Sequence, residues 1–299
     1  MTDTIGVDVG GTKVAAALVA DDGRIVARAR RSSVSRDYQA LLDTVVATVR
    51  EAAAEQPVSA VGLAIAGNVA ADGSSVLFSP HLPLSGEPLL VDLRDRLGCP
   101  VTVDNDANAA AWAEYRFGSY AATDDLLLVA LGTGIGAGLV LDGGLYRGSN
   151  GFAGEAGHLT VVRDGRVCPC GSRGCWERYA SGTALLAAYL ERGGNPELGG
   201  PDITAAALGG DETAREALAD IGDWLGRGLA SLVAVLDPGV VVIGGGVSEA
   251  GELLMAPALK AFRSALTGRG LRPEPSVAVA SLGVDAGVVG AAALALHHL

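Results

Sequence analysis

Three cysteines and one histidine form the strongest chemical signal in the sequence. Cys168, Cys170 and Cys175 fall within eight residues, and His158 precedes the first of them by ten residues. Three thiolates and one imidazole are a common ligand set of closed structural zinc sites, whereas unpaired surface thiols are the alternative. In a reducing compartment a cluster this dense indicates a metal before a disulfide. The pattern therefore predicts a structural Zn²⁺ ion bound by these four residues.

Two glutamates flank the predicted zinc ligands. Glu155 lies three residues before His158, and Glu177 lies two residues after Cys175. A zinc ion that joins His158 to the cysteines would bring both carboxylates toward one site. Charged groups that converge on a rigid, glycine-rich cleft suit a polyol ligand. Solvated surface glutamates are the alternative, and the spacing alone leaves both interpretations open.

Two glycine-rich loops have backbone N–H groups that a phosphate could approach. The first, residues 10–13, is not a P-loop, because Thr12 precedes Lys13 and a strand follows instead of a helix. The second, residues 132–137, fits a loose G-x-G-x-x-A pattern. Residues 138–141 are typical of a strand, however, and this disfavours a dinucleotide site. Taken alone, each loop is more typical of a tight turn.

One acidic residue lies within a predicted strand, and another follows a second predicted strand. Asp8 lies in an otherwise apolar strand just before the first glycine loop. A carboxylate there is costly in a core but useful for holding Mg²⁺ through water beside phosphates. Asn105 and Asp106 follow another apolar strand, and Asp106 is predicted at the N-cap of the next helix, a role worth about 1 kcal/mol. The alternative for Asp106 is a base at the carboxyl end of a strand, where α/β proteins bind ligands.

The elements that must position these residues include a repeated hairpin. A strand at residues 5–9, a Gly/Thr loop, a strand at 14–19 and an Asp-Gly turn recur about 120 residues later, with strands at 126–131 and 138–141. The repeat predicts two similar lobes, although Gly and Asp turns are common in any hairpin protein.

Strands and helices alternate through the rest of the chain and predict an α/β class. The remaining expected elements are a helix around 41–49 stopped by Pro57, strands at 61–66, 101–103 and 240–243, and helices at 106–117, 184–190, 214–235, 253–266 and 287–297. The glycine- and proline-rich tract at 193–210 is predicted to be a surface connection.

Composition excludes several classes of protein. With 22 basic and 34 acidic residues among 299, the net charge is −12, which argues against nucleic-acid or anionic-membrane partners. The longest apolar stretch, residues 126–141, is shorter than the roughly 20 residues of a membrane span. The first residues lack the basic and apolar regions of a signal peptide, so a cytoplasmic location is expected.

Taken together, several stretches resemble the ROK family of bacterial sugar kinases, and the match covers essentially the whole chain. The stretches that carry the resemblance are Asp8–Lys13, Asn105–Asn108, Gly132–Gly134, Glu155–His158, the three clustered cysteines with Glu177, and Gly244–Gly246. Within the family, residues 105–118 are most similar to glucokinases of actinobacterial type. The resemblance implies a two-lobed actin-like ATPase (ribonuclease H-like) α/β fold with a central cleft. It implies an N-terminal lobe of residues 1–117 and a C-terminal lobe of residues 118–299.

The resemblance also implies which residues contact the sugar. They would be Gly67, Asn68, Asn105, Asp106, Glu155, His158 and Glu177. Asp106 would be the base that receives the proton of the sugar 6-hydroxyl as this attacks the γ-phosphate of ATP. One ring nitrogen of His158 would bind zinc, which fixes the ring, and the other would face the sugar.

The resemblance places ATP, with Mg²⁺, on the glycine loops. Its phosphates would be held by Asp8, Gly10, Gly11, Thr12, Lys13, Gly132, Thr133 and Gly134, and its adenosine by Gly244, Gly245 and Gly246. The family also implies a homodimer or homotetramer, and a final helix that packs on the N-terminal lobe.

Two residues depart from the usual family pattern and concern the substrate. Many relatives have Asn at the position of His81 and a bulkier residue at that of Ala156. Glucose is the expected sugar, with another hexose or an N-acetylhexosamine as the alternative. A repressor would need a helix-turn-helix before the Asp-x-Gly-Gly-Thr stretch, and this stretch begins here at residue 8, which leaves no room for one. A non-catalytic sugar sensor is disfavoured by Asp106, and a zinc dehydrogenase by the lack of a dinucleotide pattern.

Overall fold

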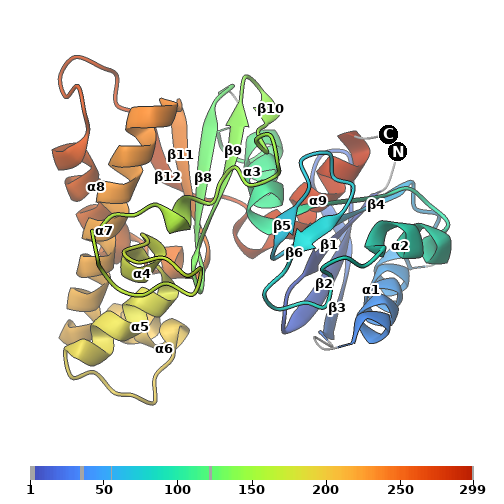
Figure 1. Ribbon diagram of the computed structural model, residues 1–299, viewed down its shortest axis with the longest axis horizontal. Helices are drawn as coiled ribbons and strands as arrows, with labels where there is room; N and C mark the ends of the chain where they lie inside the picture. The colour runs from blue at the N-terminus through green and yellow to red at the C-terminus, as the bar shows by residue number, and fades with distance from the viewer. Residues whose placement is uncertain (1–3, 34–36, 55, 121–122, 298–299) are drawn as a thin grey trace. The chain divides into compact units, whose positions relative to one another are not determined.

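The computed structural model describes residues 4–33, 37–54, 56–120 and 123–297, and the residues that bear on a signal peptide lie partly outside these ranges. The chain divides into two compact units, coloured along the chain in Figure 1. Unit 1 comprises Met1–Asp124, Gly138–Gly154 and Ser281–Leu299, and unit 2 comprises Asp125–Ala137 and Glu155–Ala280. The expectation had a boundary after residue 117 and a return of the final helix alone, and it did not include the placement of Gly138–Gly154 in unit 1.

Unit 1 is a sheet covered by helices on both faces. Its strand order is β3-β2-β1-β4-β7, with β1 antiparallel to β2 and parallel to β4. Its elements are β1 (Thr4–Val9), β2 (Lys13–Val19), β3 (Ile25–Ser32), α1 (Tyr38–Ala53), β4 (Ala60–Ile65), β5 (Asn68–Val69), β6 (Val76–Phe78), α2 (Leu89–Leu97), β7 (Val101–Asn105), α3 (Asp106–Phe117), β10 (Gly144–Leu145), a 3₁₀ turn (Gly283–Asp285) and α9 (Ala286–His297).

Unit 2 combines a second sheet with a group of helices. The strand order of this sheet is β10-β9-β8-β11-β12, in which β11 is parallel to β8 and β12, and β10 with the end of β9 is counted in unit 1. Its elements are β8 (Leu126–Leu131), the first part of β9 (Ile135–Leu141), a 3₁₀ turn (Ala156–His158), α4 (Glu177–Ala180), α5 (Gly182–Glu191), α6 (Gly200–Leu208), α7 (Glu212–Leu236), β11 (Val240–Gly244), a 3₁₀ segment (Gly246–Ala250), α8 (Glu252–Ala265) and β12 (Ser276–Val279).

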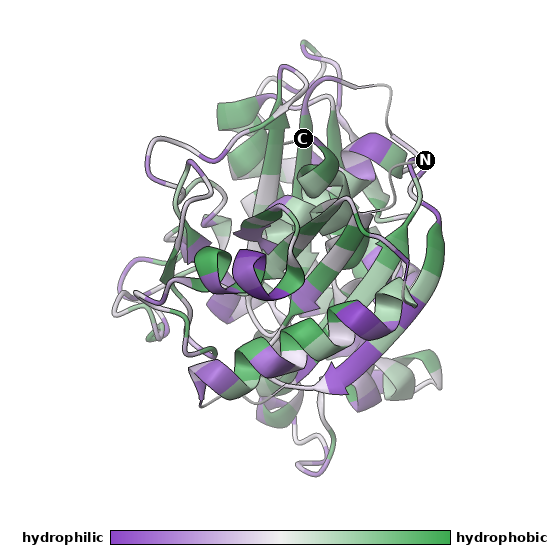
Figure 2. Cartoon of the chain, turned by 90° about the vertical axis from the view of Figure 1, so that its right-hand side faces the viewer, coloured by the Kyte–Doolittle hydropathy of each residue, from purple (hydrophilic) through white to green (hydrophobic). Residues whose placement is uncertain are grey.

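The period-2 pattern of β1 explains how unit 1 builds two layers. Ile5, Val7 and Val9 point to one face and join the core formed with α1 and α2. Gly6 faces the other way, where a Cβ would fall on the carbonyl oxygen of Val288 in α9. Figure 2 shows hydrophobic and hydrophilic residues alternating along the helices, as expected for helices with one buried side.

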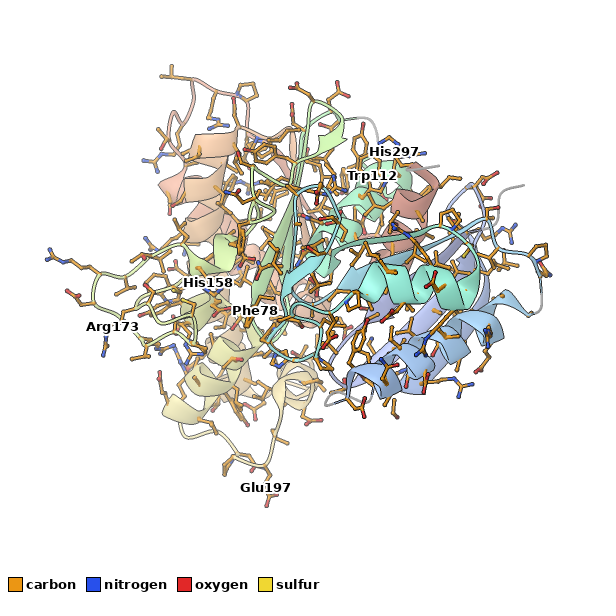
Figure 3. The ribbon with its side chains drawn as sticks, turned by 45° about the vertical axis from the view of Figure 1, so that its right-hand side comes forward. Phe78, Trp112, His158, Arg173, Glu197 and His297 are labelled. Carbon is orange, nitrogen blue, oxygen red and sulfur yellow. The ribbon has the colours of Figure 1, made fainter. Side chains whose placement is uncertain are left out.

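Helix α9 completes unit 1 because glycines let it approach the sheet closely. It contacts β1, β4 and α3. A Cβ on Gly62 of β4 would fall on the Ala291 carbonyl oxygen, and one on Gly290 would fall on that of Ala109 in α3. The Trp112 and His297 rings lie side by side, 5.5 Å between centroids (Figure 3). The last helix is therefore part of the core of unit 1.

The surface connection predicted at residues 193–210 of unit 2 is wrong in its second half, most of which is α6. The glycines and the proline at residues 199–201 form the start of this helix. Pro201 stands in the first turn, and the Asp202 carboxylate accepts the Gly199 N–H at 3.1 Å. Among the described residues, no helix combines the length and apolar character needed to cross a bilayer.

Candidate functional site

The junction of β7 and α3 presents Asp106 at the carboxyl end of a buried strand. The N-cap of α3 is Asn105, whose Oδ1 accepts the N–H groups of Ala107 at 2.9 Å and Asn108 at 3.1 Å. The predicted N-cap role of Asp106 is therefore wrong by one residue, because Asn and Asp are equally good caps. Asp106 is the first helical residue and half-buried. Helix capping therefore does not explain why a carboxylate stands at position 106.

Asp104 is a buried carboxylate that was not predicted from the sequence. It is 3% exposed, and both of its oxygens are used. Oδ1 accepts the Asn105 N–H at 2.8 Å and the Asn108 Nδ2 group at 2.9 Å. Oδ2 accepts two N–H groups of Arg147, from Nε at 2.7 Å and from Nη2 at 2.6 Å. The only sequence signal was an Asp at the end of an apolar strand, and nothing local indicated Arg147.

The Gly67–Asn68 turn lies against the same junction. The Asn105 Nδ2 group donates to the Gly67 carbonyl at 3.0 Å, so three of the predicted sugar contacts, Gly67, Asn68 and Asn105, are joined in unit 1. A Cβ on Gly67 would overlap the Phe78 carbonyl, which explains the glycine. Gly151 in turn packs on the Val69 carbonyl with a φ of +82°, a conformation that glycine adopts without strain.

The first glycine loop closes tightly between β1 and β2. The Gly10 N–H donates to the Lys13 carbonyl at 2.9 Å, and Thr12 is exposed. Burial raises the pKa of Asp8, and the Lys13 ammonium, 3.9 Å away, opposes this. Asp8 carries a half-buried carboxylate on the α9 side of the sheet, a suitable oxygen donor for hydrated Mg²⁺. The His81 Cβ would lie 3.1 Å from a Cβ on Gly11, so His81 covers this loop.

The four predicted zinc ligands converge in unit 2. The ligand atoms of His158, Cys168, Cys170 and Cys175 all lie within 4.8 Å of one another. The Cys170 and Cys175 sulfurs are 3.6 Å apart, and the Cys168 sulfur is 3.7 Å from His158 Nδ1. A tetrahedron with Zn–S bonds of about 2.3 Å has S–S edges of about 3.8 Å. The donor set and its spacing therefore fit Zn²⁺.

The local fold around the cysteines explains their convergence. A tight turn joins Cys168 to Ser172, whose carbonyl accepts the Cys168 N–H at 2.9 Å. Cys175 is held by its neighbour Trp176, which is fully buried and donates its indole N–H to the Trp224 carbonyl at 2.9 Å. Burial raises the pKa of the Cys168 and Cys175 thiols. The Ser172 N–H lowers the pKa of the Cys170 thiol.

The two ring nitrogens of His158 face different groups. Figure 3 labels this residue. Nδ1 lies toward the sulfur of Cys168 and is 3.8 Å from Glu177 Oε1. Nε2 is 3.7 Å from Glu155 Oε2. Glu155 is therefore on the side of the ring opposite the metal site, whereas Glu177 is on the metal side, 3.1 Å from the Cys168 sulfur. A metal on Nδ1 leaves Nε2 with its hydrogen, directed away from the metal.

A pocket of about 440 Å³ lies in unit 2 beside the second glycine loop. Its lining residues are Leu131, Gly132, Thr133, Gly182, Thr183, Leu186, Gly200, Pro201, Thr204, Gly246, Val247 and Glu249. Two helices, α5 and α6, direct their N-termini to it, a geometry that favours anions. The residues from α5 and α6 were not predicted from the sequence, because their approach depends on tertiary packing.

Backbone contacts fix the glycines of this pocket. The Gly132 carbonyl accepts the Gly182 N–H at 2.8 Å, and the Thr133 carbonyl accepts the Thr183 hydroxyl at 2.7 Å. Among the predicted nucleotide contacts, Gly132, Thr133 and Gly246 line the pocket. The three other predicted contacts of unit 2 lie outside its lining, and Asp8 and residues 10–13 belong to unit 1. Gly134 faces Glu177 Oε2, Gly244 is the buried end of β11, and Gly245 packs on the Leu131 backbone with a φ of +82°.

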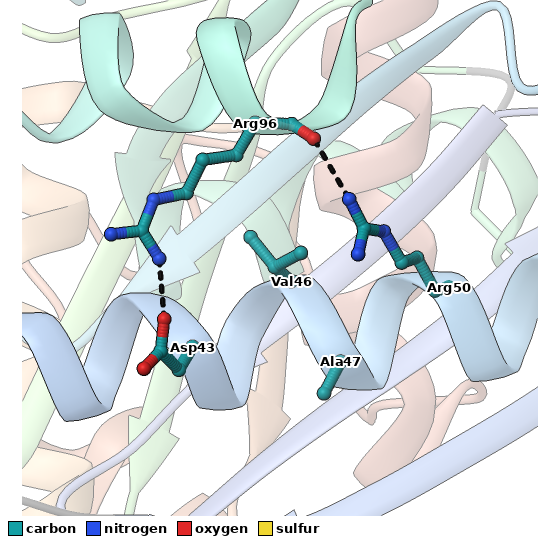
Figure 4. A pocket seen from close by; sticks show the side chains of 5 residues that line it. All are labelled: Asp43, Val46, Ala47, Arg50 and Arg96. Atoms are coloured by element: carbon teal, nitrogen blue, oxygen red, sulfur yellow. Dashed lines mark hydrogen bonds and ion pairs between the residues drawn. The ribbon is translucent and has the colours of Figure 1, made fainter.

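A second hollow, of about 330 Å³, lies between α1 and α2 of unit 1 (Figure 4). Arg96 contacts Asp43 of α1, and Arg50 donates to the Arg96 carbonyl at 3.1 Å. The guanidinium groups are engaged with neighbouring groups of the same two helices. The contacts of these two arginines therefore join α1 to α2.

Comparison with known proteins places these features in one family. A model described as the ROK family matches residues 4–298. The glucokinase of Streptomyces coelicolor is 39% identical over 308 aligned residues, which cover 98% of this chain and 97% of that enzyme. The crystal structure of a ROK family glucokinase from Streptomyces griseus, in complex with glucose and AMPPNP, gives a TM-score of 0.90 at 42% identity and covers 99% of both chains.

Regulators are similar as well. The xylose repressor of Bacillus subtilis is 29% identical over 303 aligned residues, which cover 99% of this chain and 77% of the repressor. The likeness to the Streptomyces griseus structure confirms the predicted α/β class and the two-lobed actin-like ATPase fold. With a family model that spans nearly every residue and a full-length relative at 39% identity, the chain belongs to the ROK family.

Proposed function

We propose that this protein is an ATP-dependent hexose kinase that transfers the γ-phosphoryl group of ATP to the 6-hydroxyl of glucose. The observation that carries the proposal is the Asp106 carboxylate, which stands at the carboxyl end of β7 while Asn105 caps α3. The full-length likeness to the Streptomyces glucokinases supports the same reaction and substrate. Another hexose or an N-acetylhexosamine is the alternative substrate.

Asp106 is the proposed general base. A carboxylate within hydrogen-bond distance of the 6-hydroxyl would orient this group and accept its proton as the bond to phosphorus forms. Asn105 donates to the Gly67 carbonyl and so links the base to the turn that contains Asn68. Gly67, Asn68 and Asn105 are proposed to contact the sugar hydroxyls together with Glu155, His158 and Glu177.

His158 is proposed to connect a structural zinc ion to sugar binding. The metal would be held by His158 Nδ1 and by the thiolates of Cys168, Cys170 and Cys175, whose ligand atoms lie within 4.8 Å of one another. A bound Zn²⁺ ion would stabilise this segment and fix the imidazole. The Nε2 hydrogen would then donate to a sugar hydroxyl, beside Glu155 as an acceptor.

The pocket of unit 2 is proposed to bind the nucleotide. Its volume of about 440 Å³ suits an adenosine group, and the N-termini of α5 and α6 favour the phosphates. Gly132, Thr133, Gly134 and the loop of Gly10, Gly11, Thr12 and Lys13 are proposed phosphate contacts, with Gly244, Gly245 and Gly246 at the adenosine. When bound, Mg²⁺ would neutralise phosphate charge, and Asp8 would hold it through water.

The test is ADP release with Mg–ATP across a panel of hexoses and N-acetylhexosamines. We expect glucose to give the highest kcat/KM by a wide margin. If another sugar gives the highest value, the kinase proposal stands and the assignment of glucose as substrate is wrong. His81 and Ala156 would then be the residues to test as the cause of the different specificity. No turnover with any sugar, together with measurable sugar binding, would favour the second candidate, a non-catalytic sugar sensor, which the similarity to repressors supports.

The remaining expectations stay predictions. The cytoplasmic location and the assembly as a homodimer or homotetramer are part of this proposal. Light scattering after size-exclusion chromatography measures the mass of the assembly, and twice or four times the mass of one chain, 30.0 kDa, is expected.

A further inference from the structure

Asp106 is held in place from both sides by a network that reaches back to one arginine. The Asn105 N–H before it and the Asn108 side chain after it both bind Oδ1 of Asp104, at 2.8 and 2.9 Å. The Asn105 side chain also caps the first turn of α3. The position of the Asp106 backbone therefore depends on where Asp104 Oδ1 lies.

Arg147 determines which oxygen of Asp104 is available to this turn. Its Nε and Nη2 groups both bind Oδ2, at 2.7 and 2.6 Å. This leaves Oδ1 for the two donors of the β7–α3 junction. Because Asp104 is only 3% exposed, water cannot replace a lost guanidinium donor easily. The fork of Arg147 thus fixes the rotation of the carboxylate as well as neutralising its charge.

Arg147 is itself held by the segment that leads to Glu155. The Arg147 carbonyl accepts the Ala153 N–H at 3.2 Å, which closes this segment into a loop. Gly151, inside the loop, packs on the Val69 carbonyl beside the Gly67–Asn68 turn. One side chain therefore joins the loop of residues 147–153 to the start of α3.

We propose that Arg147 is a positioning residue for phosphoryl transfer, acting through Asp104 to fix Asn105 and Asp106. The proposal rests on the proposed function in that Asp106 is taken as the base. A base displaced by about 1 Å can cost about 100-fold in rate. Arg147 itself needs no contact with sugar or ATP for this effect.

The informative variant is Arg147→Lys, because it keeps the positive charge and loses the fork. We expect kcat for the hexose to fall by about 10- to 100-fold, while KM for ATP changes less than about twofold. The loss is expected to be constant across pH, since the charge near the base is retained. The matched control is Arg28→Lys, which weakens the two-point pair of Arg28 with Asp285 in the same unit, and should leave kcat unchanged.

A second pair of variants tests the route through Asp104. Arg147→Gln leaves a buried carboxylate without its cation, and the fold itself can suffer. Adding Asp104→Asn makes both partners neutral, and an amide at 104 can still accept from Asn105 and Asn108 while donating to the glutamine. We expect the double variant to recover at least tenfold in kcat over Arg147→Gln alone. If the double variant is slower than the single one, the route through Asp104 is wrong.

Amide hydrogen exchange gives a readout that needs no turnover. In Arg147→Lys the peptide spanning residues 104–110 should exchange faster than in the wild-type protein. Unchanged kcat together with unchanged exchange in Arg147→Lys would overturn the inference. A shift of the acid limb of the pH profile of kcat would also overturn it, because such a shift indicates a direct effect of the Arg147 charge. If the wild-type protein phosphorylates no hexose, the proposed function fails instead, and exchange alone decides whether Arg147 orders this turn.

Discussion

The substitution Asp106→Asn separates catalysis from folding at the start of α3. Asn105 and not Asp106 caps the helix, so the cap is retained in this variant. The amide oxygen of the substituted side chain can still accept the Ala107 N–H, which Asp106 Oδ1 accepts at 2.8 Å. The substitution also loses the favourable interaction of a carboxylate with the helix N-terminus, about 0.3–1 kcal/mol. For a folding unit of this size, that lowers the melting temperature by about 1–4 °C.

The effect of Asp106→Asn on catalysis should be much larger. General base catalysis contributes about 10²- to 10⁴-fold to rate, equivalent to about 2.7–5.4 kcal/mol of transition-state stabilisation. We therefore expect kcat to fall at least 100-fold, with sugar affinity retained. The assay is coupled ADP release at saturating glucose and Mg–ATP, with thermal unfolding and calorimetric sugar binding on the same preparation.

Asn105→Ala is the matched comparison, because the neighbouring Asn105 side chain is expected to contribute more to stability than to the rate of the reaction. The substitution removes the cap, at a cost of about 0.5–2 kcal/mol, and also the 3.0 Å bond to the Gly67 carbonyl. Asn105→Ala should therefore be the less stable variant and Asp106→Asn the slower one. Retention of more than one hundredth of the wild-type kcat in Asp106→Asn would remove Asp106 from the role of base.

Three further predictions concern the metal, the first loop and the nucleotide pocket. Cys170→Ala should release zinc, measured by elemental analysis, and weaken sugar binding about 5- to 10-fold through a poorly fixed His158; a zinc-free variant with normal affinity would contradict this coupling. Burial raises the pKa of Asp8, so folding takes up a proton there and its ionised form costs stability as pH rises through that raised pKa. Chemical denaturation should therefore find Asp8→Asn equal to wild type in acid and more stable at neutral pH, although its activity falls; equal stability at every pH would refute the argument. A Cβ on Gly246 meets nothing within 4 Å, so Gly246→Leu should keep the wild-type melting temperature and weaken ATP binding. Gly245→Ala should instead lower the melting temperature, because its Cβ meets the backbone of β8. The reverse order, measured by calorimetric ATP binding and thermal unfolding, would show that the pocket is assigned wrongly.

Local signals made part of the site predictable. The cysteines and His158 lie within eighteen residues of one another, so ligand chemistry and spacing were sufficient to predict a cluster that the structure brings together. The same holds for the hairpins, whose apolar runs and turn residues are contiguous. Asp104 and Arg147 lie 43 residues apart, and neither has a local pattern that indicates the other. Their pairing depends on how residues 138–154, which include β10, return to unit 1.

Other differences come from residues with two structural uses. The glycines and proline at 199–201 are typical of loops, but they also suit the first turn of a helix, and α6 uses them so. Asn105 and Asp106 are equally good caps, so composition could not decide between them. The nucleotide pocket draws on α5, α6 and the segment after β11, and its lining is therefore a property of tertiary packing.

The discontinuous makeup of unit 1 has a consequence for folding during synthesis. Residues 4–124 can leave the ribosome long before α9, which fills the glycine-lined face of β1 and β4. At roughly 5–20 residues per second, the intervening residues 125–280 take on the order of ten to thirty seconds to synthesise. Throughout this interval the nascent sheet has an uncovered face and cannot reach its final packing. Unit 2 is thus free to fold before unit 1 is complete.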